Sequence, residues 1–253
     1  MKQKGRIGAV ILAGGRGSRM GGRIQKQYML LADRPMICYA LEVFEHSQVD
    51  DLVLVTGRGE AEFVRREILA DRNFKKLRTI VPGGAERYHS VYEGLKALEG
   101  CSHVLIHDGA RPLVTEEIIE RAIAGAKRYG ACVVGMPVKD TIKVADDNGF
   151  AASTPDRSHL WQIQTPQAFS YDLIRSAYDR VMADEELQAG ITDDAMVAET
   201  ALGTSIRLIE GSYENLKITT PEDLTLAEAL LKRRQPGVLF GAGMDDRQDK
   251  DGK

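Results

Sequence analysis

Apolar runs of strand length alternate with helix-like segments along most of the chain. The strand-like runs are short, rich in β-branched residues and bounded by turn residues. They cover residues 7–12, 52–56, 79–81, 103–107, 131–136, 161–165, 206–210 and 216–219. Between them apolar residues recur at helical spacing, as at Ile37, Ala40, Leu41 and Phe44. Because parallel strands need a crossover connection that is usually a helix, this alternation predicts an α/β fold with a mainly parallel sheet.

Capping and turn residues mark where several helices are expected to begin and end. Thr115, with two glutamates in the following turn, predicts a helix start, and Gly130 predicts the end of that helix. Thr192 is expected to cap a helix over residues 193–201. Pro221 suits the first position of a last helix, over residues 221–231.

Residues 139–160 interrupt the alternation. Two short extended pieces, 141–145 and 150–153, flank Asp147-Asn148-Gly149, and Asn-Gly is a strong hairpin signal. An inserted β-arm of this kind cannot bury both its faces alone, so it predicts a homodimer contact. From Pro236 the composition becomes glycine-rich and charged, which indicates a disordered tail over 236–253 after a single domain spanning 1–235.

The composition argues against several classes of protein. Apolar residues make up 43% of the 253 and charged residues 28%, as in a soluble globular protein. A net charge of −3 argues against a nucleic-acid partner, and no apolar run reaches the length of a membrane span. Cys38, Cys101 and Cys132 lack C-x-x-C spacing and lie among apolar residues. They therefore predict reduced core thiols in a cytoplasmic protein.

The first predicted strand runs into a loop rich in glycine and in basic residues. The glycines are Gly14, Gly15, Gly17, Gly21 and Gly22, and the cations are Arg16, Arg19, Arg23 and Lys26. Glycine lets backbone N–H groups converge on an anion, and the cations neutralise its charge, so the loop predicts a phosphate site. The Walker pattern is absent. Met20 replaces the third glycine of the dinucleotide fingerprint, which argues against a nicotinamide oxidoreductase.

Further candidate residues follow other predicted strands. They are Gly84, Arg87 and Ser90 after the third strand, Asp108 and Arg111 after the fourth, and Thr141 after the fifth. Ligands of open parallel sheets bind at the carboxyl ends of the strands, so these residues are expected to reach one another. Asp108 suits a magnesium ion that is also held by nucleotide phosphates, and it equally suits a turn-stabilising role. Lys217 has two interpretations: a solvated lysine at the end of a strand, or a cation that acts with Arg19 and Lys26 in nucleotidyl transfer.

An ordered set of motifs lies between residues 7 and 231. The motifs are LAGGRGSRM with KQY, PGGAERYHSV, HDGARP, VKDTIK, DRSHLWQIQTPQAF, TDDA and ENLKITTPEDL. Together they resemble the 2-C-methyl-D-erythritol 4-phosphate cytidylyltransferases of the non-mevalonate isoprenoid pathway. The resemblance implies a Rossmann-like three-layer αβα sandwich and a homodimer that exchanges β-arms. It also implies transfer of CMP from CTP to 2-C-methyl-D-erythritol 4-phosphate, with magnesium and with release of pyrophosphate.

The resemblance also implies roles for individual residues. Arg19, Lys26 and Lys217 match the family's cations that stabilise the transition state at the α-phosphate. The matches to CTP-binding positions are Ala13, Gly14, Gly15 and Gly17 for the triphosphate, and Gly84 and Ser90 for the nucleoside. The matches to positions that hold the polyol phosphate and the metal region are Asp108, Arg111, Thr141 and Thr165, with Arg157 supplied from the partner's arm.

The chain departs from the family pattern at three positions. Gly14 stands where the family usually has alanine, and Gln25 stands where it usually has the proline before K-Q-Y. Ala85 stands where an acidic residue often follows the second glycine of PGG. Two alternatives remain at this point: a ribitol-5-phosphate cytidylyltransferase, which shares ILAGG and ITTP, and a CTP-binding regulatory protein without turnover. VKDTIK and DRSHLW favour the methylerythritol enzyme over the first. Retention of Arg19, Lys26 and Lys217 favours an enzyme over the second.

Overall fold

The computed structural model describes residues 5–15, 25–70 and 72–234. Its centre is a seven-stranded sheet with the strand order β11-β7-β10-β6-β1-β4-β5. β10 (Trp161–Ser170) runs antiparallel to both its neighbours, and the other strands share one direction. These are β1 (Ile7–Leu12), β4 (Asp51–Thr56), β5 (Leu77–Pro82), β6 (His103–Asp108), β7 (Ala131–Pro137) and β11 (Arg207–Glu210). The expected α/β fold with a mainly parallel sheet is therefore confirmed.

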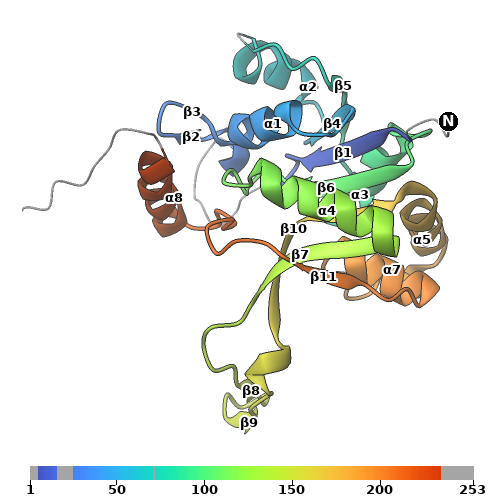
Figure 1. The fold of residues 1–253 in the computed structure, drawn as a ribbon, viewed down its shortest axis with the longest axis vertical. Helices are drawn as coiled ribbons and strands as arrows, with labels where there is room; N and C mark the ends of the chain where they lie inside the picture. The colour runs from blue at the N-terminus through green and yellow to red at the C-terminus, as the bar shows by residue number, and fades with distance from the viewer. Residues whose placement is uncertain (1–4, 16–24, 71, 235–253) are drawn as a thin grey trace, which may run out of the picture.

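Helices cover both faces of this sheet and complete a three-layer sandwich (Figure 1). One layer holds α1 (Met36–His46) and α4 (Glu116–Tyr129). The other holds α3 (Arg87–Lys96), α5 (Tyr171–Ala183) and α7 (Asp194–Leu202). Two short helices are α2 (Ala61–Phe63), which continues into a π-helical turn over Val64–Ile68, and α6 (Glu185–Gln188). In the part of the chain that the structure describes, no helix is long and apolar enough to span a membrane.

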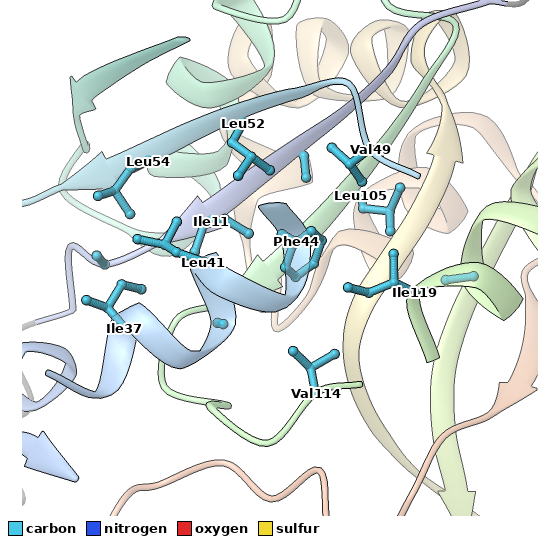
Figure 2. Close-up of a cluster of buried hydrophobic side chains, with 14 of the residues drawn as sticks. Ile11, Ile37, Leu41, Phe44, Val49, Leu52, Leu54, Leu105, Val114 and Ile119 are labelled. Carbon is cyan, nitrogen blue, oxygen red and sulfur yellow. The ribbon is translucent and has the colours of Figure 1, made fainter. Parts of the chain in front are cut away.

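Side chains of the central strands alternate between two hydrophobic cores. In β1, Ile7, Ala9 and Ile11 join the core under α1 and α4, whereas Val10 joins the core under α3, α5 and α7. Figure 2 shows the first of these cores, where Phe44 of α1 lies among aliphatic side chains of the sheet. Burial on both faces explains why these strands are continuous apolar runs in the sequence.

A smaller third core holds the C-terminal helix α8 (Pro221–Arg234) against the body. Its partner is an antiparallel pair of two-residue strands, β2 (Leu30–Leu31) and β3 (Arg34–Pro35). The residues fully or almost fully buried there include Leu31, Met36 and Ile218. This core therefore holds the segment that follows Lys26 close to the segment that carries Lys217.

The chain between β7 and β10 leaves the body as an arm (Figure 1). At its end β8 (Val144–Ala145) and β9 (Ala151–Ser153) pair antiparallel, so the hairpin predicted around Asn148 and Gly149 is confirmed. Apolar side chains on the arm are exposed, above all Phe150 at 73%. The homodimer predicted from this arm remains a prediction.

Two local predictions are wrong. Residues 216–219 form a loop instead of a strand, because Ile218 buries its side chain in the α8 core and its N–H donates to the carbonyl of Ala110 instead of to a neighbouring strand. Thr192 does not cap α7. Asp193 does, because its carboxylate accepts the N–H of Met196 at 2.9 Å.

Candidate active site

A pocket of about 920 Å³ opens at the carboxyl edge of the sheet. This is the edge at which the sequence places its candidate residues, and where ligands of parallel sheets bind. The lining residues are Leu12, Gly14, Gly15, Gln25, Lys26, Gln27, Gly57, Arg58, Glu60, Gly84, Ala85, Glu86, Arg87, Ser90, Asp108, Ala110 and Lys217.

The first part of the glycine loop forms one wall of the pocket. Ala13 is buried, and its N–H donates to the carbonyl of Val55 at 2.7 Å, so the loop leaves β1 as a continuation of the strand. Gly14 and Gly15 line the pocket, as the phosphate-loop prediction requires. Gly17 and Arg19 lie outside the described residues.

Two lysines from opposite ends of the chain converge on this pocket. Lys26 begins the 3₁₀ turn Lys26–Tyr28, and its Nζ donates to the carbonyl of Ile218 at 3.0 Å. Lys217 points its Nζ to Oδ2 of Asp108, at 2.8 Å. Lys217 is therefore a pocket residue in an ion pair, and its side chain remains 40% exposed to solvent.

Asp108 ends β6 and connects the pocket to the core. Its Oδ1 accepts from Nε of Arg87 at 3.3 Å. Arg87 donates two further hydrogen bonds of 2.8 Å to the fully buried carboxylate of Asp194. That carboxylate also accepts the hydroxyl of Tyr178 at 2.6 Å. The planar guanidinium suits this role, because it presents several N–H donors in a fixed geometry to two carboxylates at once.

These contacts determine the charge of Asp108. Burial by itself raises a carboxyl pKa, but Arg87 and Lys217 outweigh burial and hold the pKa of Asp108 well below its usual value. Asp108 therefore carries a negative charge at the pocket wall, where it is paired with Arg87 and Lys217.

Gly84 and Ser90 lie at the end of the pocket formed after β5. The N–H of Gly84 donates to Oγ of Ser90 at 3.1 Å, and that hydroxyl donates to the carbonyl of Glu86 at 3.2 Å. A Cβ at Gly84 would lie 2.2 Å from Cβ of His89, so no larger residue fits without moving α3. This close approach brings the backbone after β5 against the start of α3.

Thr165 and Arg111 lie behind Asp108 and are not lining residues. The hydroxyl oxygen of Thr165 accepts the N–H of Asp108 at 3.0 Å and lies 3.1 Å from Nδ1 of His107. Arg111 is buried and donates to the carbonyl of Asn215 at 2.7 Å, while its Nε finds no hydrogen-bond partner within the described ranges. Both residues therefore hold the backbone at the end of β6 and the loop that carries Lys217.

Thr141 and Arg157 are exposed residues of the arm that leaves the body after β7 (Figure 1), and neither of them lines the pocket. Arg157 begins a 3₁₀ turn and donates to the carbonyl of Lys139 at 2.7 Å. Within one chain these two candidates do not join the other site residues.

Sequence reasoning missed several residues of the site. Arg58 lines the pocket two residues after the end of β4, so the strand-end rule that selected Asp108 could have found it. Gln25 donates to Glu60, and Arg87 to Asp194, although these partners are 35 and 107 residues apart. Such pairs carry no local sequence signal, because the tertiary fold alone brings them together.

Comparison with known proteins places the whole domain in one family. The family model described as 2-C-methyl-D-erythritol 4-phosphate cytidylyltransferase matches residues 7–233. A protein of that name from Alkaliphilus oremlandii is 48% identical over 239 residues, which cover 94% of this chain and 100% of the relative. Another, from Geobacter metallireducens, is 48% identical over 233 residues, which cover 90% and 98%.

Solved structures give the same result for the fold. The 4-diphosphocytidyl-2C-methyl-D-erythritol synthase from Anaerococcus prevotii is similar with a TM-score of 0.79 and 32% identity, covering 90% of this chain and 97% of that one. The 2-C-methyl-D-erythritol 4-phosphate cytidylyltransferase from Thermus thermophilus has a TM-score of 0.71 and 29% identity, with 90% and 99% covered.

Proposed function

This chain belongs to the 2-C-methyl-D-erythritol 4-phosphate cytidylyltransferase family, and from that membership we propose how its pocket works. It is a nucleotidyltransferase that transfers CMP from CTP to 2-C-methyl-D-erythritol 4-phosphate in isoprenoid precursor synthesis. One observation carries the proposed mechanism. Lys26, Lys217 and Arg87 come from three distant segments and surround one pocket beside the glycine loop and the ionised Asp108.

The reaction needs alignment and charge stabilisation more than covalent help from the protein. An oxygen of the substrate phosphate attacks the α-phosphorus of CTP. A new phosphorus–oxygen bond forms there while the bond to the oxygen that bridges the α- and β-phosphates breaks, and pyrophosphate leaves with that electron pair. Lys26 and Lys217, together with Arg19, stabilise the charge that gathers on the α-phosphate oxygens during this step.

The substrate positions are proposed from the family match, with the lining of the pocket as support. The glycine loop receives the triphosphate at Gly14, Gly15 and, by the family match, Gly17, because glycine-rich turns present N–H groups to anions, and Ala13 anchors the loop through its bond to Val55. Gly84 and Ser90 receive the nucleoside at the end of the pocket formed after β5. Asp108 is proposed to face the polyol phosphate and the metal region, and Arg111 and Thr165, which match the same family positions, support it from behind.

We propose that Asp108, an ionised carboxylate in the pocket wall, is the residue that would hold magnesium. No group of three or more His, Cys, Asp or Glu side chains among residues 5–15, 25–70 and 72–234 is placed to hold a metal. An ion with one protein carboxylate takes its other ligands from nucleotide phosphates and water, which is the usual magnesium arrangement. When bound, magnesium neutralises charge on the CTP phosphates. The chain's own cations then act on the α-phosphate.

The arm is proposed to complete the site of a second copy of this chain in a homodimer. Thr141 and Arg157 would then reach the polyol phosphate of the partner's pocket. The support is that both lie on an exposed arm, and that Ile142, Val144 and Phe150 of the arm expose apolar surface. Shortening residues 141–155 to a two-residue turn should give a monomer by sedimentation equilibrium. A dimer of unchanged strength would argue against this interface.

The proposed setting is the cytoplasm, with residues 1–235 as one catalytic domain. Cys38, Cys101 and Cys132 are free and buried, and burial raises the pKa of each thiol, to about 11, 11 and 12. Inert, reduced thiols suit a reducing compartment.

The deciding experiment measures pyrophosphate release from CTP and magnesium with two acceptors offered side by side. Release with 2-C-methyl-D-erythritol 4-phosphate and much less with ribitol 5-phosphate is the expected result. Preference for ribitol 5-phosphate would keep the nucleotide site and overturn the acceptor. Tight CTP binding without release from either would favour a regulatory protein.

A further inference from the structure

Glu60 is a carboxylate in the wall of a pocket otherwise suited to polyanions, and its oxygens already have donors. Oε1 accepts the side-chain amide of Gln25. Oε2 accepts the backbone N–H of Gly57 at 3.0 Å and the hydroxyl of Tyr28 at 3.2 Å. With three donors directed at it, Glu60 connects the end of β4 to the segment around Lys26.

The side chains on both sides of Lys26 belong to the same network. Gln27 donates its amide to Oε1 of Gln25 at 2.6 Å and also to the carbonyls of Ala13 and Gly15. Gln27 is 2% exposed. The backbone on each side of Lys26 is therefore held by side-chain contacts: through Gln25 to Glu60 on one side, and through Gln27 to the glycine loop on the other.

The backbone of Gln25 has the geometry of a proline. Its φ is −61° and its ψ is 139°, within the range that a pyrrolidine ring imposes. Glutamine does not enforce this conformation by itself, because its φ is free in the unfolded chain. A hydrogen bond from its side chain to a fixed acceptor can hold the residue there.

We infer that Gln25 and Glu60 are positioning residues for Lys26, and that their hydrogen bond does by side-chain contact what a proline ring does covalently. The inference rests on the proposed function, since the proposed role of Lys26 is to stabilise the α-phosphate transition state. Both residues line the pocket, and the role inferred for them acts through Lys26 instead of through the reacting atoms. We call this Gln25–Glu60 hydrogen bond the clamp. Its loss should move the Lys26 ammonium while leaving most of the CTP site intact.

The test compares the effect of Glu60→Ala in the wild-type protein with its effect in the Gln25→Pro variant. Glu60→Ala should lower kcat for pyrophosphate release by about tenfold or more, because a displacement near 1 Å costs up to about a hundredfold, while KM for CTP changes by less than about threefold. In the Gln25→Pro background the same Glu60→Ala change should cost less than about threefold, because the ring now restrains φ. Glu62→Ala, an exposed neighbour outside the pocket, is the matched control.

Two results would overturn the inference. One is an unchanged kcat in Glu60→Ala. The other is an equal loss of kcat in both backgrounds, which would show that Glu60 acts on something other than the conformation of residue 25. If Glu60→Ala does not fold, Glu60→Met serves in the same comparison, because it keeps the approximate size of the side chain and removes both acceptor oxygens.

Amide hydrogen exchange separates this inference from the proposed function. The N–H groups of Tyr28 and Met29 donate to the carbonyls of Gln25 and Lys26 at 2.9 and 3.1 Å. Their exchange should become faster in Glu60→Ala and slow again in the Gln25→Pro/Glu60→Ala double variant. This readout needs no acceptor substrate. It therefore stands even if the wild-type protein releases no pyrophosphate with 2-C-methyl-D-erythritol 4-phosphate, and unchanged exchange in Glu60→Ala would overturn the clamp by itself.

Discussion

The ammonium group of Lys26 donates a hydrogen bond of 3.0 Å to the backbone carbonyl of Ile218, which is 192 residues away and directly follows Lys217. The same short segment is fixed by the N–H of Ile218, which donates to the carbonyl of Ala110. Lys217 in turn pairs with Asp108. The positions of the two lysines in the pocket are therefore coupled through one buried residue.

Lys26→Ala should lower kcat by about 100- to 1,000-fold and change the affinity for CTP much less. The reason is that its charge acts on the transition state more than on the bound nucleotide. Steady-state kinetics together with calorimetric CTP binding measure both quantities. Lys127→Ala, an exposed lysine on α4 outside the pocket, is the control and should leave both unchanged. Equal losses in kcat and in CTP affinity would contradict the role.

Arg87→Ala should lower the free energy of unfolding by about 3–5 kcal/mol, because it leaves the carboxylate of Asp194 buried without its cation. Urea denaturation measures this change. Arg66→Ala is the matched control, since Arg66 pairs with Glu67 on the surface, with side chains 70% and 52% exposed. Its cost should stay below about 1 kcal/mol. Similar losses in the two variants would show that the Arg87–Asp194 pair is not the source of the stability.

His107 should make the protein less stable as the pH falls from about 6.5 to about 4. Burial lowers the pKa of His107 to about 4, against 6.5 in an unfolded chain, so between these values the unfolded state binds the proton and the folded state does not. Above pH 6.5 the ring is neutral in both states and does not lower the stability. Below about pH 4 the loss in the free energy of unfolding reaches its full value of about 3 kcal/mol. An NMR titration of the ring should give a midpoint near 4. A midpoint at the unperturbed value would contradict the expected effect.

Mixed dimers test whether the arm crosses to the partner's pocket. Arg157→Ala and Lys26→Ala homodimers should each be nearly inactive. A heterodimer of the two should regain activity, because one of its pockets combines an intact Lys26 with an intact Arg157 from the other chain. Two different affinity tags give heterodimers of known composition. No recovery in such heterodimers would place Arg157 outside the partner's site.

The sequence was sufficient to predict most of the regular secondary structure of this molecule. Strands buried on both faces leave apolar runs, and the helices between them leave an apolar periodicity, so the sheet and most helices were predicted within a few residues. The glycine loop and Asp108 were found for the same reason, because each directly follows a strand whose end is visible in the sequence. The stretch 216–219 was assigned to a strand because an apolar run does not reveal whether it is buried in a sheet or against a helix.

The α/β fold, the sheet edge that carries the candidate site, and the family motifs with their basic residues could all be predicted from local patterns along the chain. Which of these residues meet depended on how the layers pack. That packing brought Lys217 and Arg87 to Asp108, Gln25 to Glu60, and Lys26 to Ile218, and it left Thr141 and Arg157 out of the lining of the pocket in their own chain. The physical reason is that strand and helix patterns arise from local periodicity and burial. Ion pairs and hydrogen bonds between distant segments depend on how the layers pack, and packing leaves no period in the sequence.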